Sequence, residues 1–311
     1  MERLSGNDRV DGTLRGGIVA LGNFDGFHEG HQAVVGRAVE LARSRGVPAV
    51  VATFDPHPVR FFKPETPPFS LTTLDQRQRL FAEAGADAML VYHFDTQLAA
   101  VSAQDFVADY LVGRAGATGV VTGRDFTFGA KRVGNVSVLA ELAAKHGISC
   151  ETVGPVSDGE ETISSSRIRA ALQAGDPATA ARLLTRPFAI QGMVQHGDKL
   201  GRTIGYPTAN IDMGGYIRPR YGIYAVRGRL PDGRVVDGAA NLGVRPTFDP
   251  PKELLEPYFF DFSENLYGQV IEVELHAFLR PEAKFDSLDT LTAQMAKDCD
   301  TARAILSAQA Q

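Results

Sequence analysis

Short apolar runs alternate with helix-like segments through the first half of the chain, and this alternation restricts the fold more than any other feature. Each run is four to six residues long, as is typical of a buried strand. The runs occupy residues 18–21, 49–54, 88–92, 119–122 and 148–153, and the clearest helix-like segments lie at about 31–44, 74–84 and 138–145. Buried strands separated by helices form a parallel sheet that is covered on both faces. We therefore predict an α/β domain whose ligands bind at the carboxyl ends of its strands.

The pattern changes near residue 185, after which strands and turns replace the alternation. Residues 221–230 and 234–240 flank a Pro-Asp-Gly sequence, which is a typical hairpin turn. Along residues 270–279 apolar side chains recur at every second position, as in a half-buried strand. The last segment predicts a helix with Ser287 as its N-cap and an apolar stripe of Leu288, Leu291, Met295, Ala302 and Ile305. This half predicts a small antiparallel β-barrel with a C-terminal helix.

Length and composition agree with two globular domains, which we place at 1–184 and 185–311. A chain of 311 residues with 44% hydrophobic residues can bury two cores, so a largely disordered protein is excluded. The net charge of −5 argues against nucleic-acid binding. Cys150 and Cys299 lie too far apart for a disulfide framework or a cysteine zinc site, and they fit a reducing compartment. With neither a signal peptide nor a run of about 20 apolar residues, we expect a cytoplasmic protein without a membrane partner.

The densest polar motif is G-N-F-D-G-F-H-E-G-H at residues 22–31, where the first predicted strand turns into a helix. Its glycines let the backbone approach a phosphate, and a helix N-terminus presents N–H groups and a positive dipole. His28 and His31 are three residues apart, so both can face that site and donate to phosphate oxygens. A glycine loop with surface histidines is the plain alternative. A zinc site is disfavoured, because no third ligand has a suitable spacing.

Three further motifs follow predicted strands or open a helix. The sequence T-F-D-P-H-P at 53–58 fits a rigid turn as well as a binding site. The loop G-R-D-F-T-F-G at 123–129 suits a ligand with a flat ring, with a packed loop as the alternative. Three serines and two arginines at 164–169 exceed what a helix cap requires and predict an anion site.

In the second half, two features could serve phosphate chemistry. If residues 207–211 are extended, Thr208 and Asn210 point the same way and offer hard oxygen ligands suited to Mg²⁺. Glu256 is a carboxylate in an otherwise apolar strand, which usually marks a solvent-facing position. The adjacent Pro257 predicts a sheet edge or bulge, where a side chain can be aimed at a site.

Taken in order, these motifs resemble the bacterial bifunctional riboflavin kinase/FAD synthetase family. The motifs that carry the resemblance are G-N-F-D-G-x-H-x-G-H, F-D-P-H-P, G-x-D-F-x-F-G and S-S-S-x-I-R, followed by G-x-x-L-G-R-x-x-G-Y-P-T-A-N and N-L-G-V-R-P-T-F. The resemblance implies a Rossmann-like nucleotidyltransferase domain that transfers AMP from ATP to FMN, giving FAD and pyrophosphate. It implies a second domain that phosphorylates riboflavin to FMN with ATP.

The resemblance also implies roles for individual residues. His28 and His31 would bind the ATP phosphates and stabilise the leaving pyrophosphate, and Glu256 would be the general base of the kinase. The remaining ATP contacts would come from Gly22, Asn23, Phe24, Asp25, Ser164, Ser165 and Arg169. Asp125 and Phe128 would hold the flavin, and Thr208 and Asn210 would bind Mg²⁺.

Two other functions stay open at this point. One is an enzyme with a single activity, and the other is a flavin carrier without catalysis. The intact His28, His31, Thr208, Asn210 and Glu256 argue against both, because a carrier needs no phosphate machinery. The sequence also leaves the oligomeric state open, a homo-oligomer included.

Overall fold

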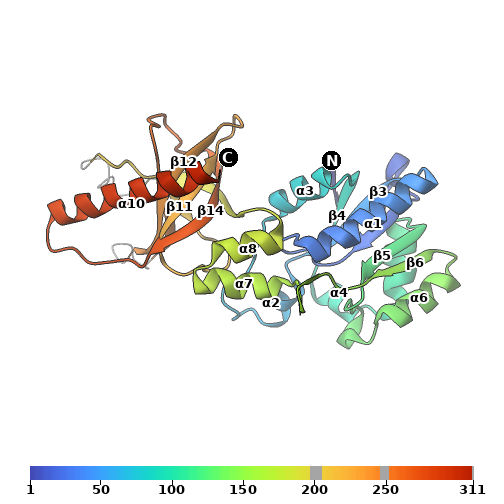
Figure 1. Cartoon of the computed structure of the whole chain (residues 1–311). Helices are drawn as coiled ribbons and strands as arrows, with labels where there is room; N and C mark the ends of the chain where they lie inside the picture. The colour runs from blue at the N-terminus through green and yellow to red at the C-terminus, as the bar shows by residue number, and fades with distance from the viewer. Residues whose placement is uncertain (197–204, 246–251, 310–311) are drawn as a thin grey trace. The chain divides into compact units, whose positions relative to one another are not determined.

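The structure is a computed structural model that describes residues 1–196, 205–245 and 252–309 (Figure 1). Contacts within the chain divide it into two units. The first comprises 1–67 and 73–164, and the second comprises 68–72 and 165–311. This division by contacts falls 20 residues before the predicted boundary at 184/185, which concerns function and stays a prediction.

A six-stranded parallel sheet forms the centre of the first unit, in the order β1-β4-β3-β2-β5-β6. Its strands are β1 (Glu2–Ser5), β2 (Ile18–Leu21), β3 (Ala49–Asp55), β4 (Ala88–His93), β5 (Gly119–Gly123) and β6 (Ser149–Val153). The five predicted strands are confirmed. The edge strand β1 was not predicted, because Glu-Arg-Leu-Ser contains no apolar run.

Helices follow most of these strands. They are α1 (Glu29–Arg45), α2 (Pro58–Phe62), α3 (Leu74–Glu83), α4 (Thr96–Ala100), α5 (Ala103–Asp105), the π-helix η2 (Phe106–Arg114) and α6 (Val136–Lys145). Their ends agree with local chemistry: α1 stops at Gly46, whose φ of 67° favours glycine. A capping box of Thr73 and Gln76 starts α3.

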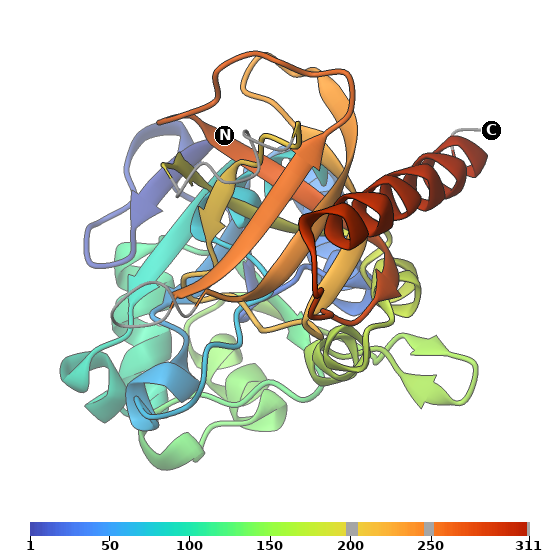
Figure 2. The same ribbon diagram turned by 90° about the vertical axis from the view of Figure 1, so that its left-hand side faces the viewer.

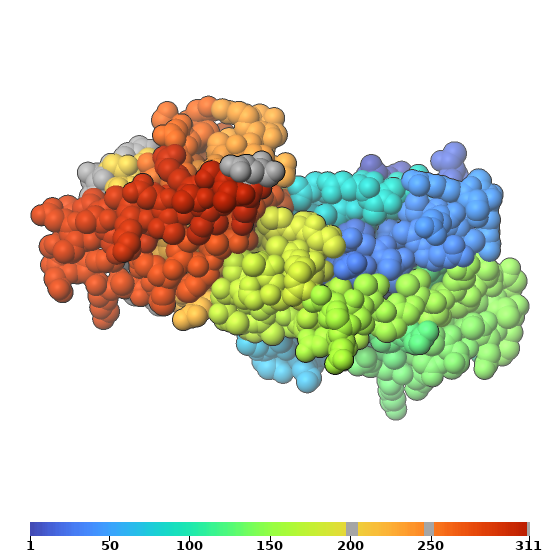
Figure 3. Space-filling model, viewed as in Figure 1, coloured from blue at the N-terminus to red at the C-terminus, as the bar shows by residue number. Residues whose placement is uncertain are grey.

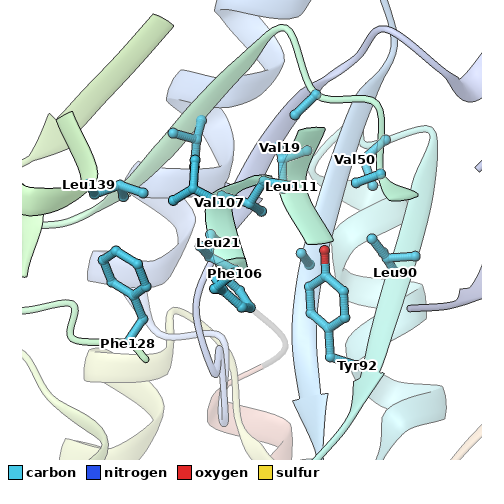
Figure 4. Close-up of a cluster of buried hydrophobic side chains, with 14 of the residues drawn as sticks. Val19, Leu21, Val50, Leu90, Tyr92, Phe106, Val107, Leu111, Phe128 and Leu139 are labelled. Carbon is cyan, nitrogen blue, oxygen red and sulfur yellow. The ribbon is translucent and has the colours of Figure 1, made fainter. Parts of the chain in front are cut away.

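Two apolar clusters cover the two faces of the sheet, and the alternation along β2 separates them. Ile18 and Ala20 belong to the cluster under α1, whereas Val19 and Leu21 belong to the cluster on the opposite face. Figure 4 shows the second cluster, with Leu111 of η2 beside the strands. The predicted parallel sheet with two covered faces is confirmed.

The second unit is a closed barrel in the order β10-β13-β12-β11-β14-β9. Its strands are β9 (Phe188–Gln195), β10 (Asn210–Asp212), β11 (Gly222–Arg229), β12 (Val235–Arg245), β13 (Lys252–Phe259) and β14 (Val270–Arg280), all paired antiparallel. Two helices, α7 (Ser165–Ala174) and α8 (Pro177–Leu184), precede the barrel, and α8 packs against β9 and β14. The predicted small antiparallel barrel is confirmed.

The C-terminal helix α10 (Leu288–Ala308) begins after the N-cap Ser287, as predicted. It crosses the outside of the barrel beside β14 (Figure 2) and covers one side of it in the space-filling view (Figure 3). The predicted apolar stripe is wrong at its first residue, because Leu288 is 58% exposed. The buried positions are Asp298, Ala302 and Leu306, and Asp298 is buried because it pairs with Arg280 of β14 at 2.6 Å. Within the described ranges, no helix combines the length and hydrophobicity that a membrane crossing requires.

Candidate functional site

The loop between β2 and α1 lies at the carboxyl end of a central strand, where ligands of parallel sheets bind. Phe24 and Phe27 hold positive φ angles of 52° and 44°, which bulky residues rarely adopt. Both rings pack on Phe81 of α3, with centroid distances of 5.8 and 5.0 Å. This aromatic packing stabilises the strained loop, and such strain is typical of binding sites.

The two predicted histidines lie together at the start of α1. The ring of His28 stacks on the ring of His31, with 3.7 Å between centroids, and the edge of Phe24 meets His31 at 5.4 Å. Gly30 leaves room for this arrangement, since a Cβ at that position would lie 3.2 Å from His28 Cε1. Because the first N–H groups of a helix have no partner within it, this site combines two imidazoles with helix-terminal donors. It can bind a polyanion.

A buried arginine beneath this loop was missed by the sequence analysis. Arg77 of α3 is 7% exposed, and its Nη1 donates to Thr53 Oγ1 at 3.0 Å and to the carbonyl oxygen of Asn23 at 3.3 Å. A signal was present in the sequence: Arg77 stands three and four residues before Leu80 and Phe81, on the apolar face of the helix.

Aromatic rings surround the loop that carries the predicted flavin residues. Phe128 is only 6% exposed and packs on Phe106, which in turn contacts Tyr92 (Figure 4). Phe126 is half-buried and stacks on Phe128 at 5.8 Å. The exposed Asp125 precedes Phe126 in the loop. The flavin role of Asp125 and Phe128 stays a prediction.

The predicted anion cradle at residues 164–169 spans the division between the units. Ser164 ends the first unit, whereas Ser165 and Arg169 belong to the second. Arg169 Nε donates to the carbonyl oxygen of Phe69 at 2.7 Å, and its guanidinium lies 5.1 Å from the centroid of that ring. The shared role of these three residues in binding ATP stays a prediction.

In the barrel, strand pairing brings three predicted polar residues into one region. Ile211 pairs with Leu255, so the same register places Asn210 opposite Glu256. Residues directly opposite each other in a sheet share a face. Asn210 is 7% exposed, and Thr208, two residues earlier, is half-buried.

Of the two alternatives predicted at Pro257, the bulge is wrong, because the register of β13 with β12 runs without a shift. On the other side β10 pairs only with Leu254 and Leu255, so Pro257 lies beyond the paired part of that strand. Pro257 has no N–H to donate, but its carbonyl oxygen accepts a hydrogen bond from Ala209 N at 3.0 Å. The neighbouring strand β10 is short, which leaves proline tolerable at this position.

Charged and polar side chains of the barrel contact Glu256 or its partner Arg245. Arg245 of β12 forms an ion pair with Glu256, and its Nη1 donates to Glu282 Oε1 at 3.3 Å. Asn241, the partner of Glu256 in the β12–β13 register, donates to the same Glu282 oxygen at 3.2 Å. Burial lowers the pKa of Arg245, but its bonds to Glu256 and Glu282 outweigh burial and raise it overall.

Thr208 and Asn210 are the two residues predicted to bind Mg²⁺. The described residues hold no cluster of three or more His, Cys, Asp or Glu side chains that could bind a metal. The hydroxyl of Thr208 and the side-chain amide oxygen of Asn210 are hard donors, and Mg²⁺ usually keeps waters and substrate phosphates as its other ligands. The donor set therefore fits Mg²⁺ brought in with ATP. The G-D-K-L-G-R-T-I segment at 197–204 and the P-T-F segment at 246–248 lie outside the described residues.

Comparison with known proteins decides the family. The FAD synthetase family model matches residues 11–167, and the riboflavin kinase family model matches residues 184–306. The chain belongs to the bifunctional riboflavin kinase/FMN adenylyltransferase family. The two family models leave most of α7 and α8 between them.

Individual relatives agree with this family. The bifunctional riboflavin kinase/FMN adenylyltransferase of Escherichia coli strain K12 is 40% identical, over 93% of this chain and 92% of that protein. The protein of the same description from Bacillus subtilis strain 168 is 38% identical, over 90% of each chain. A crystal structure described as a macrolide-efflux protein from Streptococcus pneumoniae matches with a TM-score of 0.86 at 32% identity. That match covers 97% of this chain and 99% of the other. Both units therefore have a counterpart in one solved chain.

Proposed function

We propose that the two activities of the family reside in separate domains of this chain, residues 1–184 and 185–311. The first domain would transfer AMP from ATP to FMN and release pyrophosphate, and the second would transfer the γ-phosphate of ATP to riboflavin. The observation that supports this division most strongly is the position of the polar groups. A stacked histidine pair lies at a helix N-terminus of the α/β domain, and the strand register of the barrel places Glu256 opposite Asn210.

In adenylyl transfer the phosphate of FMN attacks the α-phosphorus of ATP, and the bond from that phosphorus to the bridging oxygen breaks. The nucleophile is already ionised, so this step needs no base. Negative charge grows on the leaving pyrophosphate, and donors fixed in advance stabilise it best. His28, His31 and the N–H groups at the start of α1 would supply these donors. Gly22, Asn23, Phe24 and Asp25 line the same loop.

The kinase step differs because its nucleophile is an alcohol. The ribityl hydroxyl of riboflavin must lose a proton as it attacks the γ-phosphorus, and Glu256 would accept that proton. The ion pair with Arg245 orients the carboxylate. Thr208 and Asn210 would hold Mg²⁺, which would neutralise charge on the ATP phosphates.

Other polar and aromatic residues would contact the two substrates of adenylyl transfer. Ser164, Ser165 and Arg169 would add anion contacts for ATP, and Asp125 and Phe128 would contact the flavin of FMN. Free thiols at Cys150 and Cys299 fit a cytoplasmic enzyme.

One assay separates this proposal from its alternatives. The full chain is incubated with riboflavin, ATP and Mg²⁺, and the flavins are separated by chromatography. We expect FMN to appear first and FAD to follow. FMN alone would indicate an enzyme with only the kinase activity, and neither product would indicate a flavin carrier. Supplying FMN in a parallel reaction tests the adenylyl transfer by itself.

A further inference from the structure

Arg77 carries a buried charge that forms no ion pair with any carboxylate of the described residues. Its side chain is packed inside the first unit at 7% exposure, and no carboxylate of the described residues lies within ion-pair distance of it. Its Nε has no hydrogen-bond partner among the described residues. Burial lowers the pKa of Arg77, and the more distant Asp25 and Asp55 oppose that shift. Burying a guanidinium without an anion beside it lowers the stability of the fold.

Arg77 holds the carbonyl oxygen of Asn23 directly and also through the hydroxyl of Thr53. Arg77 Nη1 and Thr53 Oγ1 both donate to the carbonyl oxygen of Asn23, at 3.3 and 2.8 Å. Thr53 lies in β3 and is fully buried, so this anchor belongs to the rigid sheet. Arg77 also donates to Thr53 Oγ1 at 3.0 Å, which leaves the hydroxyl proton for Asn23. The three groups thus fix the orientation of a single peptide plane.

The orientation of this plane has a consequence for the loop. In a trans peptide the C=O and the following N–H point in opposite directions. Because the Asn23 carbonyl points towards Arg77 and Thr53, the N–H of Phe24 points away from them. Within the described residues this N–H forms no hydrogen bond. The φ angle of Phe24 is 52°, so the backbone is in the left-handed region at this residue. An oriented backbone donor without a partner, on a phosphate loop, is a typical anion contact.

We propose that Arg77 is a positioning residue for adenylyl transfer. It orients the Asn23–Phe24 peptide so that the Phe24 N–H donates to the triphosphate of ATP. Its own charge is balanced by that triphosphate when ATP binds. The inference rests on the proposed adenylyl transfer at this loop. A residue that only stabilised the fold would alter melting without altering the affinity for ATP.

The test compares variants of the full chain in FAD synthesis from supplied FMN. Arg77→Met removes the charge and both donated bonds, and we expect KM for ATP to rise about 10- to 100-fold with a smaller change in kcat. Arg77→Lys keeps the charge and one donor and should recover part of the affinity. Thr53→Val removes the second anchor of the same carbonyl, whereas Thr53→Ser retains it. Because both residues act on one atom, Arg77→Met and Thr53→Val should be non-additive in combination.

Two controls make the result decisive. Arg79→Met changes a partly exposed arginine of the same helix and should leave KM for ATP unchanged. A melting curve of each variant reports whether the first unit is folded, and riboflavin phosphorylation reports whether the barrel is intact. If Arg77→Met does not fold, Thr53→Val carries the test. If the folded variants keep the KM of the unmodified protein, the positioning role is wrong. If the unmodified protein makes no FAD, the proposed function itself has failed.

Discussion

Arg245 on β12 forms an ion pair with Glu256 on the neighbouring strand β13. The same guanidinium also donates to Glu282, which accepts a further hydrogen bond from Asn241. The carboxylate of Glu256 is therefore oriented by a network that spans two strands and the segment after β14. Such a network is typical of a residue whose direction matters, and it distinguishes Glu256 from an ordinary solvated carboxylate.

Replacing Glu256 by glutamine tests its role as the base. Glu256→Gln keeps the size of the side chain but cannot accept a proton, so riboflavin phosphorylation should fall by about 10²–10⁴. Conversion of supplied FMN to FAD should not change, because that nucleophile needs no base. Initial rates of both steps at saturating ATP and Mg²⁺ measure the effect. Glu264→Gln, which alters an exposed carboxylate paired with Arg234, serves as the control. A folded Glu256→Gln variant with near-normal kinase activity would remove Glu256 from the mechanism.

The histidine pair should affect only the other reaction. His28→Ala or His31→Ala removes a donor aimed at the leaving pyrophosphate, a loss of about 10²–10³ in the rate of FAD synthesis. Riboflavin supplied with ATP should then accumulate as FMN. The exposed His146 lies at the end of α6, and His146→Ala should leave both rates unchanged. Equal loss of both products in a histidine variant would indicate misfolding rather than a lost donor.

Asn210 should set the magnesium requirement of the kinase. Asn210→Ala removes the side-chain oxygen of a proposed metal ligand, so the Mg²⁺ concentration for half-maximal riboflavin phosphorylation should rise by at least about tenfold. The measurement is a Mg²⁺ titration of each step at a fixed ATP concentration. FAD synthesis should keep its Mg²⁺ dependence, and so should the kinase activity of Asn265→Ala, a change at an exposed loop asparagine. An unchanged titration for Asn210→Ala would show that this amide does not bind the metal.

Two fragments test where the kinase unit begins. Both 165–311 and 185–311 should phosphorylate riboflavin and make no FAD, but the shorter fragment should melt at least about 5 °C lower. The reason is that α8 packs on β9 and β14 and buries Leu183 and Leu184. Both fragments lack residues 68–72, so the comparison isolates the two helices. Equal melting temperatures would contradict a contribution of α8 to the barrel. A folded but inactive 165–311 fragment would contradict independent kinase function.

The cysteines should react slowly with alkylating agents. Burial and nearby carboxylates raise the pKa of Cys299 from 9.0 to about 11, and burial raises that of Cys150 as well. Only the thiolate reacts with the alkylating agent. At pH 8, raising the pKa of Cys299 from 9.0 to about 11 therefore lowers its thiolate fraction about 100-fold. Its alkylation rate should rise about tenfold per pH unit until near pH 11. Mass spectrometry after iodoacetamide treatment measures each site, with denatured protein as the reference. Equal rates in folded and denatured protein would refute the shift.

The local pattern of the sequence determined the type of each fold and most strand positions. Apolar runs, helical spacing and the Pro-Asp-Gly turn all act over a few residues, so they can be interpreted without knowing what lies beside them. The motif at 22–31 also predicted the site of the histidine pair, because a helix entrance positions residues three apart by itself. The edge strand β1 has no such pattern, because it becomes a strand through its pairing with β4.

Only the tertiary structure decided which distant residues meet. The register that places Asn210 and Asn241 beside Glu256 depends on pairing between strands, and the period-two pattern of a strand does not specify its neighbours. The pairing also decided between the two alternatives at Pro257, because the unbroken register with β12 leaves no bulge there. Arg77 carries no motif in the sequence, and only the folded sheet places Thr53 and Asn23 at its guanidinium. Periodicity along a chain reports how deeply each residue is buried, whereas function here depends on contacts between residues far apart in sequence.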